Sequence, residues 1–137
     1  MQATDHTPDG RRLLAIDDEP LAADLIARVA RKCGYEARAI VETSALTDLI
    51  AKWRPDVITL DLRMPRVNGA AVIDLLKTIR FGGYIIIASG LGRSFLDAAR
   101  FQAERDDLKV AAALRKPLDL QALRELLTGL PLDSADA

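Results

Sequence analysis

The sequence has one cysteine, Cys33, among its 137 residues. One thiol cannot form an internal disulfide, and it excludes a zinc site built from several cysteines. Aromatic residues make up only 4% of the chain, which leaves no evident stacking platform for single-stranded nucleic acid. The formal net charge is −1, so no overall basic field would attract nucleic acid or an anionic membrane. We therefore expect no nucleic-acid partner and no membrane partner.

Long apolar runs are also missing from the chain. No stretch approaches the roughly 18–20 apolar residues that span a bilayer, and residues 1–10 are polar and lack the apolar core of a signal peptide. The sequence thus predicts a soluble, cytoplasmic protein. Half of its residues are hydrophobic, which is enough for a core in one domain of this length. We expect a flexible N-terminal tail over 1–10, one domain over 11–130 and a short C-terminal tail over 131–137.

Short apolar runs alternate with segments of helical periodicity throughout this domain. Strands are expected at 11–17, 36–41, 56–61, 84–89 and 109–115. The first helix should begin at Pro20 and end near Gly34, and two rows of residues repeat at helical spacing along it: Leu21, Leu25, Val29 and Ala22, Ile26, Ala30. Thr43 or Ser44 is the expected cap of the second helix, a turn at Asn68-Gly69 precedes the third, the fourth ends near Asp106, and Asp119 caps the last. Five strand–helix pairs predict an α/β fold with a doubly wound, mostly parallel sheet covered on both faces.

Polar residues follow four of these strands at the point where each strand ends. Asp17 and Asp18 follow the first, Asp61 the third, and Ser89 and Lys116 end the fourth and fifth. In a parallel sheet these residues meet at the carboxyl-end edge, where open α/β sheets bind ligands. Three carboxylates repel one another unless a cation lies between them, and Mg²⁺ is a cation that prefers oxygen ligands. A carboxylate beside Mg²⁺ is well placed to attack a phosphoryl group.

Each of these residues also has a purely structural interpretation. Asp17 and Asp18 are common residue types at the start of a helix. Asp61 and the Ser89-Gly90 pair are ordinary loop starters, and a lysine at a strand end is usually solvated. The bond between Lys116 and Pro117 is a candidate cis peptide, which would aim the lysine inward.

The combination is more specific than any one residue. Together, the motifs Ile16-Asp17-Asp18-Glu19-Pro20, Leu60-Asp61-Leu62-Arg63-Met64-Pro65 with Asn68-Gly69, Ala88-Ser89-Gly90 and Arg115-Lys116-Pro117 resemble those of the CheY-like receiver domain of response regulators. The resemblance covers residues 11–130 and implies a flavodoxin-like sheet with strand order 2-1-3-4-5. It also implies that the chain is no ordinary enzyme, but a phosphoacceptor that takes part in its own phosphotransfer and dephosphorylation.

Residue by residue, the resemblance implies that Asp61 accepts a phosphoryl group in a Mg²⁺-dependent reaction. The donor would be a phosphohistidine of a sensor histidine kinase or a histidine phosphotransfer protein, and the output would be contact with a downstream protein target. Asp18 would bind Mg²⁺ directly, Asp17 directly or through water, and Arg63 through its backbone carbonyl. Ser89 and Lys116 would contact the phosphoryl group.

Two features depart from the family pattern. Members usually carry Tyr or Phe three positions before the lysine, and this chain has Ala113 there. The usual coupling between hydroxyl and aromatic ring therefore cannot operate in its standard form. Lys116 follows Ser89 by 27 positions, several more than is usual, with the additional residues expected in the fourth helix or in 104–107.

Other interpretations remain open from the sequence. A flavodoxin would need a phosphate-binding loop where Asp17-Asp18-Glu19 would repel the flavin phosphate. A haloacid-dehalogenase-like phosphatase would need a second acid where Arg63 stands. A phosphorylation-independent docking module is favoured by Ala113 but opposed by the complete acidic, hydroxyl and lysine set. We expect a stand-alone regulator, with a receiver cut from a longer chain as the alternative.

Overall fold

The computed structural model describes residues 11–63 and 69–132. Along these residues strands and helices alternate: β1 (Arg11–Ile16), α1 (Pro20–Lys32), β2 (Tyr35–Ile40), α2 (Leu46–Trp53), β3 (Val57–Leu60), α3 (Gly69–Thr78), β4 (Tyr84–Ser89), α4 (Arg93–Arg105), β5 (Lys109–Arg115) and α5 (Leu120–Gly129). The strands pair in parallel in the order β2-β1-β3-β4-β5. The expected fold class and strand order are confirmed. The tails over 1–10 and 133–137, and Asn68 of the predicted turn, lie outside the described residues.

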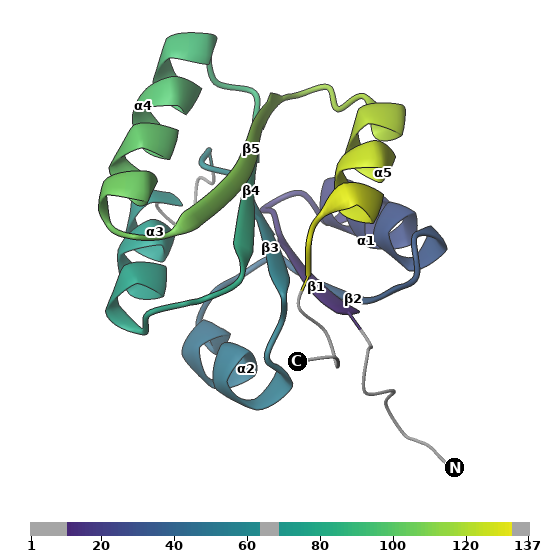
Figure 1. Cartoon of the computed structure of the whole chain (residues 1–137), viewed down its shortest axis with the longest axis horizontal. Coiled ribbons are helices and arrows are strands. Elements are labelled where there is room, and N and C mark those ends of the chain that lie inside the picture. The colour runs from purple at the N-terminus through teal and green to yellow at the C-terminus, as the bar shows by residue number, and fades with distance from the viewer. Residues whose placement is uncertain (1–10, 64–68, 133–137) are drawn as a thin grey trace.

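Helices cover both faces of the sheet. Figure 1 shows α1 and α5 on one side and α2, α3 and α4 on the other. Ile85 and Ile87 of β4 belong to the apolar cluster under α2–α4, whereas Ile86 between them belongs to the cluster under α1 and α5. Because both faces are buried, β3 and β4 are mostly apolar and show no alternation of apolar and polar residues. Within the described ranges, no helix is long and apolar enough to cross a membrane.

The helix ends agree with the sequence in some places and differ in others. Gly34 follows α1 with φ +93°, a conformation that favours glycine. Asp119 caps α5, since its Oδ1 accepts hydrogen bonds from Gln121 N at 3.0 Å and Ala122 N at 3.2 Å. The prediction that Thr43 or Ser44 caps α2 is wrong. Ala45 holds the cap position, where its methyl group cannot accept a hydrogen bond, and Ser44 Oγ donates to Glu42 Oε1 at 2.7 Å.

Helix α1 buries a different stripe from the one its leucines suggest. Leu21, Leu25 and Val29 repeat at helical spacing, but only Val29 is buried, and Leu21 is 85% exposed. Of the second expected row, Ile26 and Ala30 are buried. The buried stripe consists of small and branched residues, namely Ala23, Ile26, Ala27, Val29 and Ala30. Alanines let the helix approach the sheet closely.

Strand β5 contains a bulge that the sequence analysis did not predict. Val110 pairs with Ile85, and the next pair along β4, Ile86, is with Ala112, so Ala111 is one extra residue. Side chains alternate along a strand, and Val110 and Ala113 would therefore lie on opposite faces without it. With the bulge, both belong to the cluster under α2–α4. The bulge accommodates one residue of the long segment between Ser89 and Lys116.

Arginine side chains bind carbonyl groups on both edge strands. Arg31 of α1 donates to Ala37 O of β2 at 2.9 Å. Arg93 and Arg100 of α4 donate to Ala113 O and Val110 O of β5 at 3.1 and 3.4 Å. Each bond satisfies a backbone acceptor on a strand that has a neighbour on one side only.

Candidate functional site

The carboxylates predicted to converge do so at the carboxyl ends of β1 and β3. Asp17 N donates to Ile40 O and Asp61 N donates to Ile16 O, both at 3.1 Å. These backbone bonds continue the sheet one residue beyond the strands, so the two carboxylates are held by the sheet itself. Asp17 is 1% exposed and Asp61 is 6% exposed. Buried carboxylates need partners, because burial alone strongly disfavours their charge.

Lys116 is the main partner of both carboxylates. Its Nζ lies 2.6 Å from Asp17 Oδ2 and 3.0 Å from Asp61 Oδ2, and Glu19 Oε1 lies 3.7 Å away at the exposed rim. The peptide bond from Lys116 to Pro117 is cis, as the sequence suggested. The lysine is therefore the counter-ion of the acidic cluster, and the interpretation of Lys116 as a merely solvated side chain is wrong.

The second oxygen of each carboxylate binds the backbone of the loop that follows. Asp17 Oδ1 accepts a hydrogen bond from Glu19 N at 3.0 Å, and Asp61 Oδ1 accepts one from Arg63 N at 2.9 Å. This pattern, in which an aspartate binds the amide two residues on, fixes the start of each loop. The oxygen atoms of Asp61 are thereby oriented before any ligand arrives.

Burial and pairing act in opposite directions on the pKa values of the cluster. Burial raises the pKa of Asp17 above 3.8, although the hydrogen bonds from Lys116 and from the Glu19 amide oppose the rise. For Lys116, burial alone would lower the pKa, but the hydrogen bonds to Asp17 and Asp61 outweigh burial and raise it above 10.5. At neutral pH the lysine is therefore charged and neutralises part of the acidic cluster.

Ser89 lies at the same edge of the sheet but does not bind Asp61 in the described residues. Its side chain is fully buried, and its Oγ accepts a hydrogen bond from Leu91 N at 3.3 Å. Its carbonyl accepts one from Lys116 N at 2.9 Å. The hydroxyl is a donor as well as an acceptor, so its proton is available to a group placed between β3 and β4.

The residues expected to hold Mg²⁺ lie at the acidic end of the sheet, and part of their charge is balanced by Lys116. In the described ranges, no three His, Cys, Asp or Glu side chains are arranged as a metal-binding group. The amine of Lys116 lies against both Asp17 and Asp61, where it supplies the positive charge. Asp18 nevertheless has a buried Oδ1 without a hydrogen-bond partner. An oxygen-only donor set with an unpartnered carboxylate oxygen fits a hard cation such as Mg²⁺.

Two side chains near the site were missed from the sequence. Thr59, two residues before Asp61 on β3, is 1% exposed, and its hydroxyl has no hydrogen-bond partner in the described residues. A hydrophilic residue inside the run Val57–Leu60 is the only signal that could have pointed to it. Arg93, which donates to Ala113 O, was missed because a long side chain on a helix start has no sequence pattern of its own.

Comparison with known proteins identifies the family of the chain. The family model of the response regulator receiver domain matches residues 13–128. The chain is 27% identical over 124 residues to sporulation initiation phosphotransferase F of Bacillus subtilis, covering 90% of this chain and 96% of that protein. It spans only 29% of the longer DNA-binding response regulator MtrA of Mycolicibacterium smegmatis, with 33% identity over 70 residues.

Solved structures show the same fold. A response regulator from Colwellia psychrerythraea superposes with a TM-score of 0.76 at 26% identity, covering 86% of this chain and 94% of that one. A response regulator from Burkholderia pseudomallei, solved with a phosphorylated aspartic acid, a calcium ion and citrate, has a TM-score of 0.70 at 24% identity, with coverage of 87% and 67%.

Proposed function

The chain belongs to the response regulator receiver domain family of two-component systems, and from its site we propose that Asp61 is the residue that accepts the phosphoryl group. The observation that carries the proposal is the hydrogen bond from Lys116 Nζ to Asp61 Oδ2 at 3.0 Å, inside a buried acidic cluster. The donor is a phosphohistidine on a sensor histidine kinase or a histidine phosphotransfer protein. Signalling then proceeds through contact with a downstream protein.

In the transfer, an oxygen of Asp61 attacks the phosphorus atom. The bond from phosphorus to the histidine nitrogen breaks, and the electron pair leaves with the imidazole, which takes up a proton. Arg63 N orients the carboxylate through Oδ1. Lys116 is already beside Oδ2 and binds a phosphoryl oxygen as a point charge. Ser89 donates its hydroxyl proton to another.

Mg²⁺ is the cofactor that the acidic cluster fits. Asp18, with its unpartnered oxygen, is the proposed direct ligand, together with Asp61, with Asp17 directly or through water, and with the backbone carbonyl of Arg63. When bound, the ion supplies positive charge to the transferring phosphoryl group. The Burkholderia protein, whose structure holds a phosphorylated aspartic acid and a calcium ion, gives a precedent for a divalent cation on this fold.

The test is intact mass spectrometry after incubation with acetyl phosphate and Mg²⁺. We expect one added phosphoryl group in the wild-type protein and none in Asp61→Asn. Asp56→Asn is a matched control, because Asp56 stands just before the same strand at its opposite end and binds Arg12 N there at 2.9 Å. That control should be labelled like the wild type, and a labelled Asp61→Asn would refute the assignment.

A phosphorylation-independent docking module is the second candidate, and Ala113 is the observation that favours it. Its methyl group leaves no aromatic ring to relay a change at Ser89. If the wild-type protein takes up no phosphoryl group while still binding a partner protein, this second function is the correct one.

A further inference from the structure

We propose that Arg93 transmits the signal in place of the aromatic side chain that other receiver domains usually carry at the position of Ala113. Arg93 would do so by holding the first turn of α4 against β5 until Asp61 is phosphorylated. The inference rests on the proposed function, because the signal that it transmits begins at Asp61. The signal would leave the site through the hydrogen bond that Arg93 Nη1 donates to Ala113 O at 3.1 Å.

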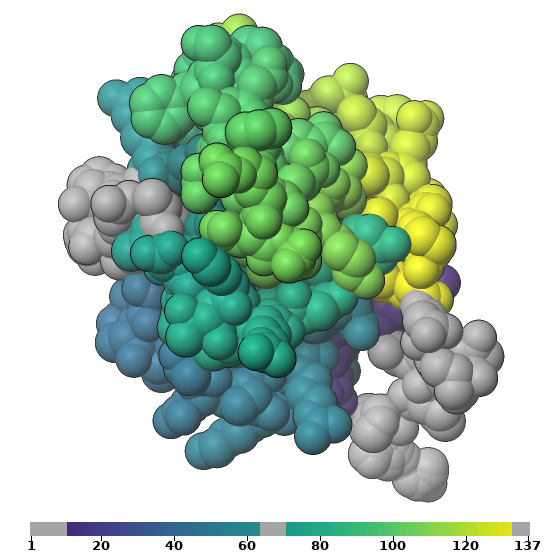
Figure 2. Space-filling view, turned by 60° about the vertical axis from the view of Figure 1, so that its left-hand side comes forward, coloured from purple at the N-terminus to yellow at the C-terminus, as the bar shows by residue number. Residues whose placement is uncertain are grey.

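The attachment of α4 by apolar packing is slight. Only Leu96 and Ala103 are buried among its 13 residues, whereas α1, of the same length, buries five. On β5, beneath α4, the cluster on this face includes Val110 and Ala113, and Ala113 contributes only a methyl group. Phe95 and Phe101 of α4 are 60% and 64% exposed. Figure 2 shows the helix standing at the surface of this face, above α3. A helix so weakly packed can shift at low cost.

Hydrogen bonds from two arginines attach α4 to β5 where apolar packing is slight. Arg93 and Arg100 are seven positions apart on α4, or about 10.5 Å along the helix. Their acceptors Ala113 O and Val110 O are three positions apart on β5, which is at most about 10 Å along a strand. The matched spacing, with the two chains running in opposite directions, means that the arginines fix where α4 lies along β5.

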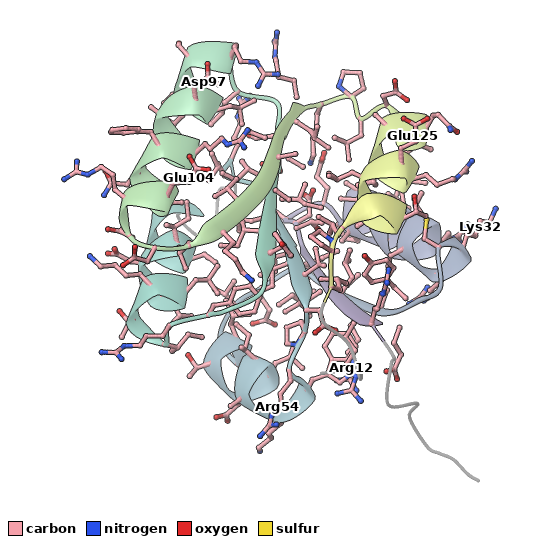
Figure 3. The ribbon with its side chains drawn as sticks, viewed as in Figure 1. Arg12, Lys32, Arg54, Asp97, Glu104 and Glu125 are labelled. Atoms are coloured by element: carbon pink, nitrogen blue, oxygen red, sulfur yellow. The ribbon has the colours of Figure 1, made fainter. Side chains whose placement is uncertain are left out.

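Each arginine also has an acidic neighbour one turn further along the helix. Arg93 lies 3.8 Å from Asp97 and Arg100 lies 3.5 Å from Glu104. Figure 3 labels Asp97 near the upper end of α4 and Glu104 further down the same helix. Arg93 therefore has two available states, one bound to Ala113 O and one bound to Asp97 alone. A switch requires such a pair of discrete arrangements.

Arg93 differs from Arg100 in being connected to the phosphorylation site. Ser89 Oγ binds Leu91 N, and Arg93 begins the helix two residues later. No atom lies within 4 Å of where a side chain would begin at Gly90 or Gly92, so the intervening loop has space to move. Rotation of the Ser89 side chain toward a phosphoryl group on Asp61 moves Oγ and takes away the acceptor of Leu91 N. Loss of this bond lets the loop move, and Arg93 moves with it away from Ala113 O.

The experiment measures amide hydrogen exchange of Arg93→Gln, with Arg100→Gln as the matched control on the same helix. The reporting amides are those of Phe95 and Leu96, which bind Gly92 O at 3.0 and 3.1 Å. Samples are compared with and without beryllofluoride and Mg²⁺, which mimic the phosphoryl group. In the wild type we expect beryllofluoride to speed exchange at Phe95 and Leu96 by about fivefold, the effect of one lost charge-assisted hydrogen bond at a half-exposed position.

In Arg93→Gln these amides should exchange faster before any addition, and beryllofluoride should add little. Arg100→Gln should keep the wild-type difference at Phe95 and Leu96. Arg93→Gln with wild-type exchange in both states would overturn the inference. Labelling of Asp61 by acetyl phosphate is measured in parallel and should be unchanged in both variants. If the wild type is not labelled, the proposed function fails and so does the switch, while the exchange of the untreated proteins still decides whether Arg93 holds α4.

Discussion

The amine of Lys116 lies 2.6 Å from Asp17 Oδ2, a contact that joins the ends of the first and last strands across 99 sequence positions. In this position the lysine provides the positive charge that a cluster of buried carboxylates requires. The same amine is the group proposed to bind a phosphoryl oxygen on Asp61. Stability of the metal-free protein and chemistry of the site therefore depend on one side chain.

Removing this amine should destabilise the protein without unfolding it. Lys116→Met leaves Asp17 and Asp61 facing each other without a cation, and we expect the free energy of unfolding at pH 7 to fall by about 2 kcal/mol. Urea denaturation measures the loss, and Lys52→Met, on the exposed surface of α2, is the control with the same change of charge. Because a divalent cation can replace the amine, Mg²⁺ should stabilise Lys116→Met more than the wild type. Equal stabilisation of both proteins would contradict this role.

The stability lost in Lys116→Met should depend on pH in the alkaline range. Pairing raises the pKa of Lys116 in the folded protein above the 10.5 of the unfolded chain. The stabilisation is therefore complete below pH 10.5 and is lost as the pH rises through the higher folded value. The difference in unfolding free energy between wild type and Lys116→Met should be constant from pH 8 to pH 10 and should shrink only beyond 10.5.

Ionised Asp17 should contribute to the free energy of unfolding with the opposite sign to Lys116, and its contribution should change at acidic pH. Burial raises its pKa above 3.8, so its charged form costs stability at neutral pH, and the cost disappears as the pH falls toward 3.8. Asp17→Asn should raise the melting temperature of the metal-free protein at pH 7 by about 2–4 °C. The advantage should vanish below pH 3.8. A lower melting temperature at pH 7 would show that attraction to Lys116 outweighs burial.

The buried hydroxyl of Thr59 is expected to lower the free energy of unfolding. It is buried without a partner in the described residues, and Thr59→Val removes it while keeping the shape of the side chain. We expect a gain of about 1 kcal/mol in unfolding free energy. Thr78→Val is the control, because Thr78 Oγ1 is exposed and donates to Asp74 O at 2.9 Å. A destabilised Thr59→Val would indicate a bound water at the hydroxyl.

The two adjacent glycines before β4 should respond differently to alanine. A Cβ at Gly83 would fall on the carbonyl oxygen of Asp56 and on the ring of Phe81, whereas one at Gly82 meets no atom within 4 Å. Gly83→Ala should cost about 1–3 kcal/mol of unfolding free energy. Gly82→Ala should be close to neutral. Equal losses would show that backbone freedom, and not close approach, decides the choice of glycine here.

The sequence predicted this fold well because its strands end in distinctive residues. The bounds expected for β4 and β5 are those observed, and β1 and β3 differ from expectation by one residue at an end or at both. Asp17, Asp61 and Lys116 could be placed at one edge because parallel strands bring their carboxyl ends together. The metal ligands and the phosphoryl transfer stay predictions, since both depend on groups that bind from outside the chain.

The bulge in β5, the hydrogen bond at Ser89 and the cap of α2 could not be predicted from residue spacing, each for a physical reason. The bulge at Ala111 lies in a run of three alanines, which carries no inward–outward alternation to reveal the register. The hydrogen bond that Leu91 N donates to Ser89 Oγ depends on the side-chain rotamer of Ser89, which no residue spacing indicates. The expectation for the start of α2 was wrong because the helix begins at Leu46, which leaves Ala45 at the cap position and Ser44 one residue before it, where its Oγ donates to Glu42 Oε1.

The arginines on the two edge strands also have a consequence for self-association. A strand from a second molecule that extended the sheet would donate amides to carbonyls of an edge strand, and the carbonyls of Ala37 on β2 and of Val110 and Ala113 on β5 are acceptors on these edges. Guanidinium groups already occupy those acceptors, and their charge repels an identical approaching edge. Growth into fibres by edge-to-edge addition is thus opposed at both ends of the sheet. Release of Arg93 would expose the carbonyl oxygen of Ala113, so the phosphorylated protein would self-associate more readily through β5.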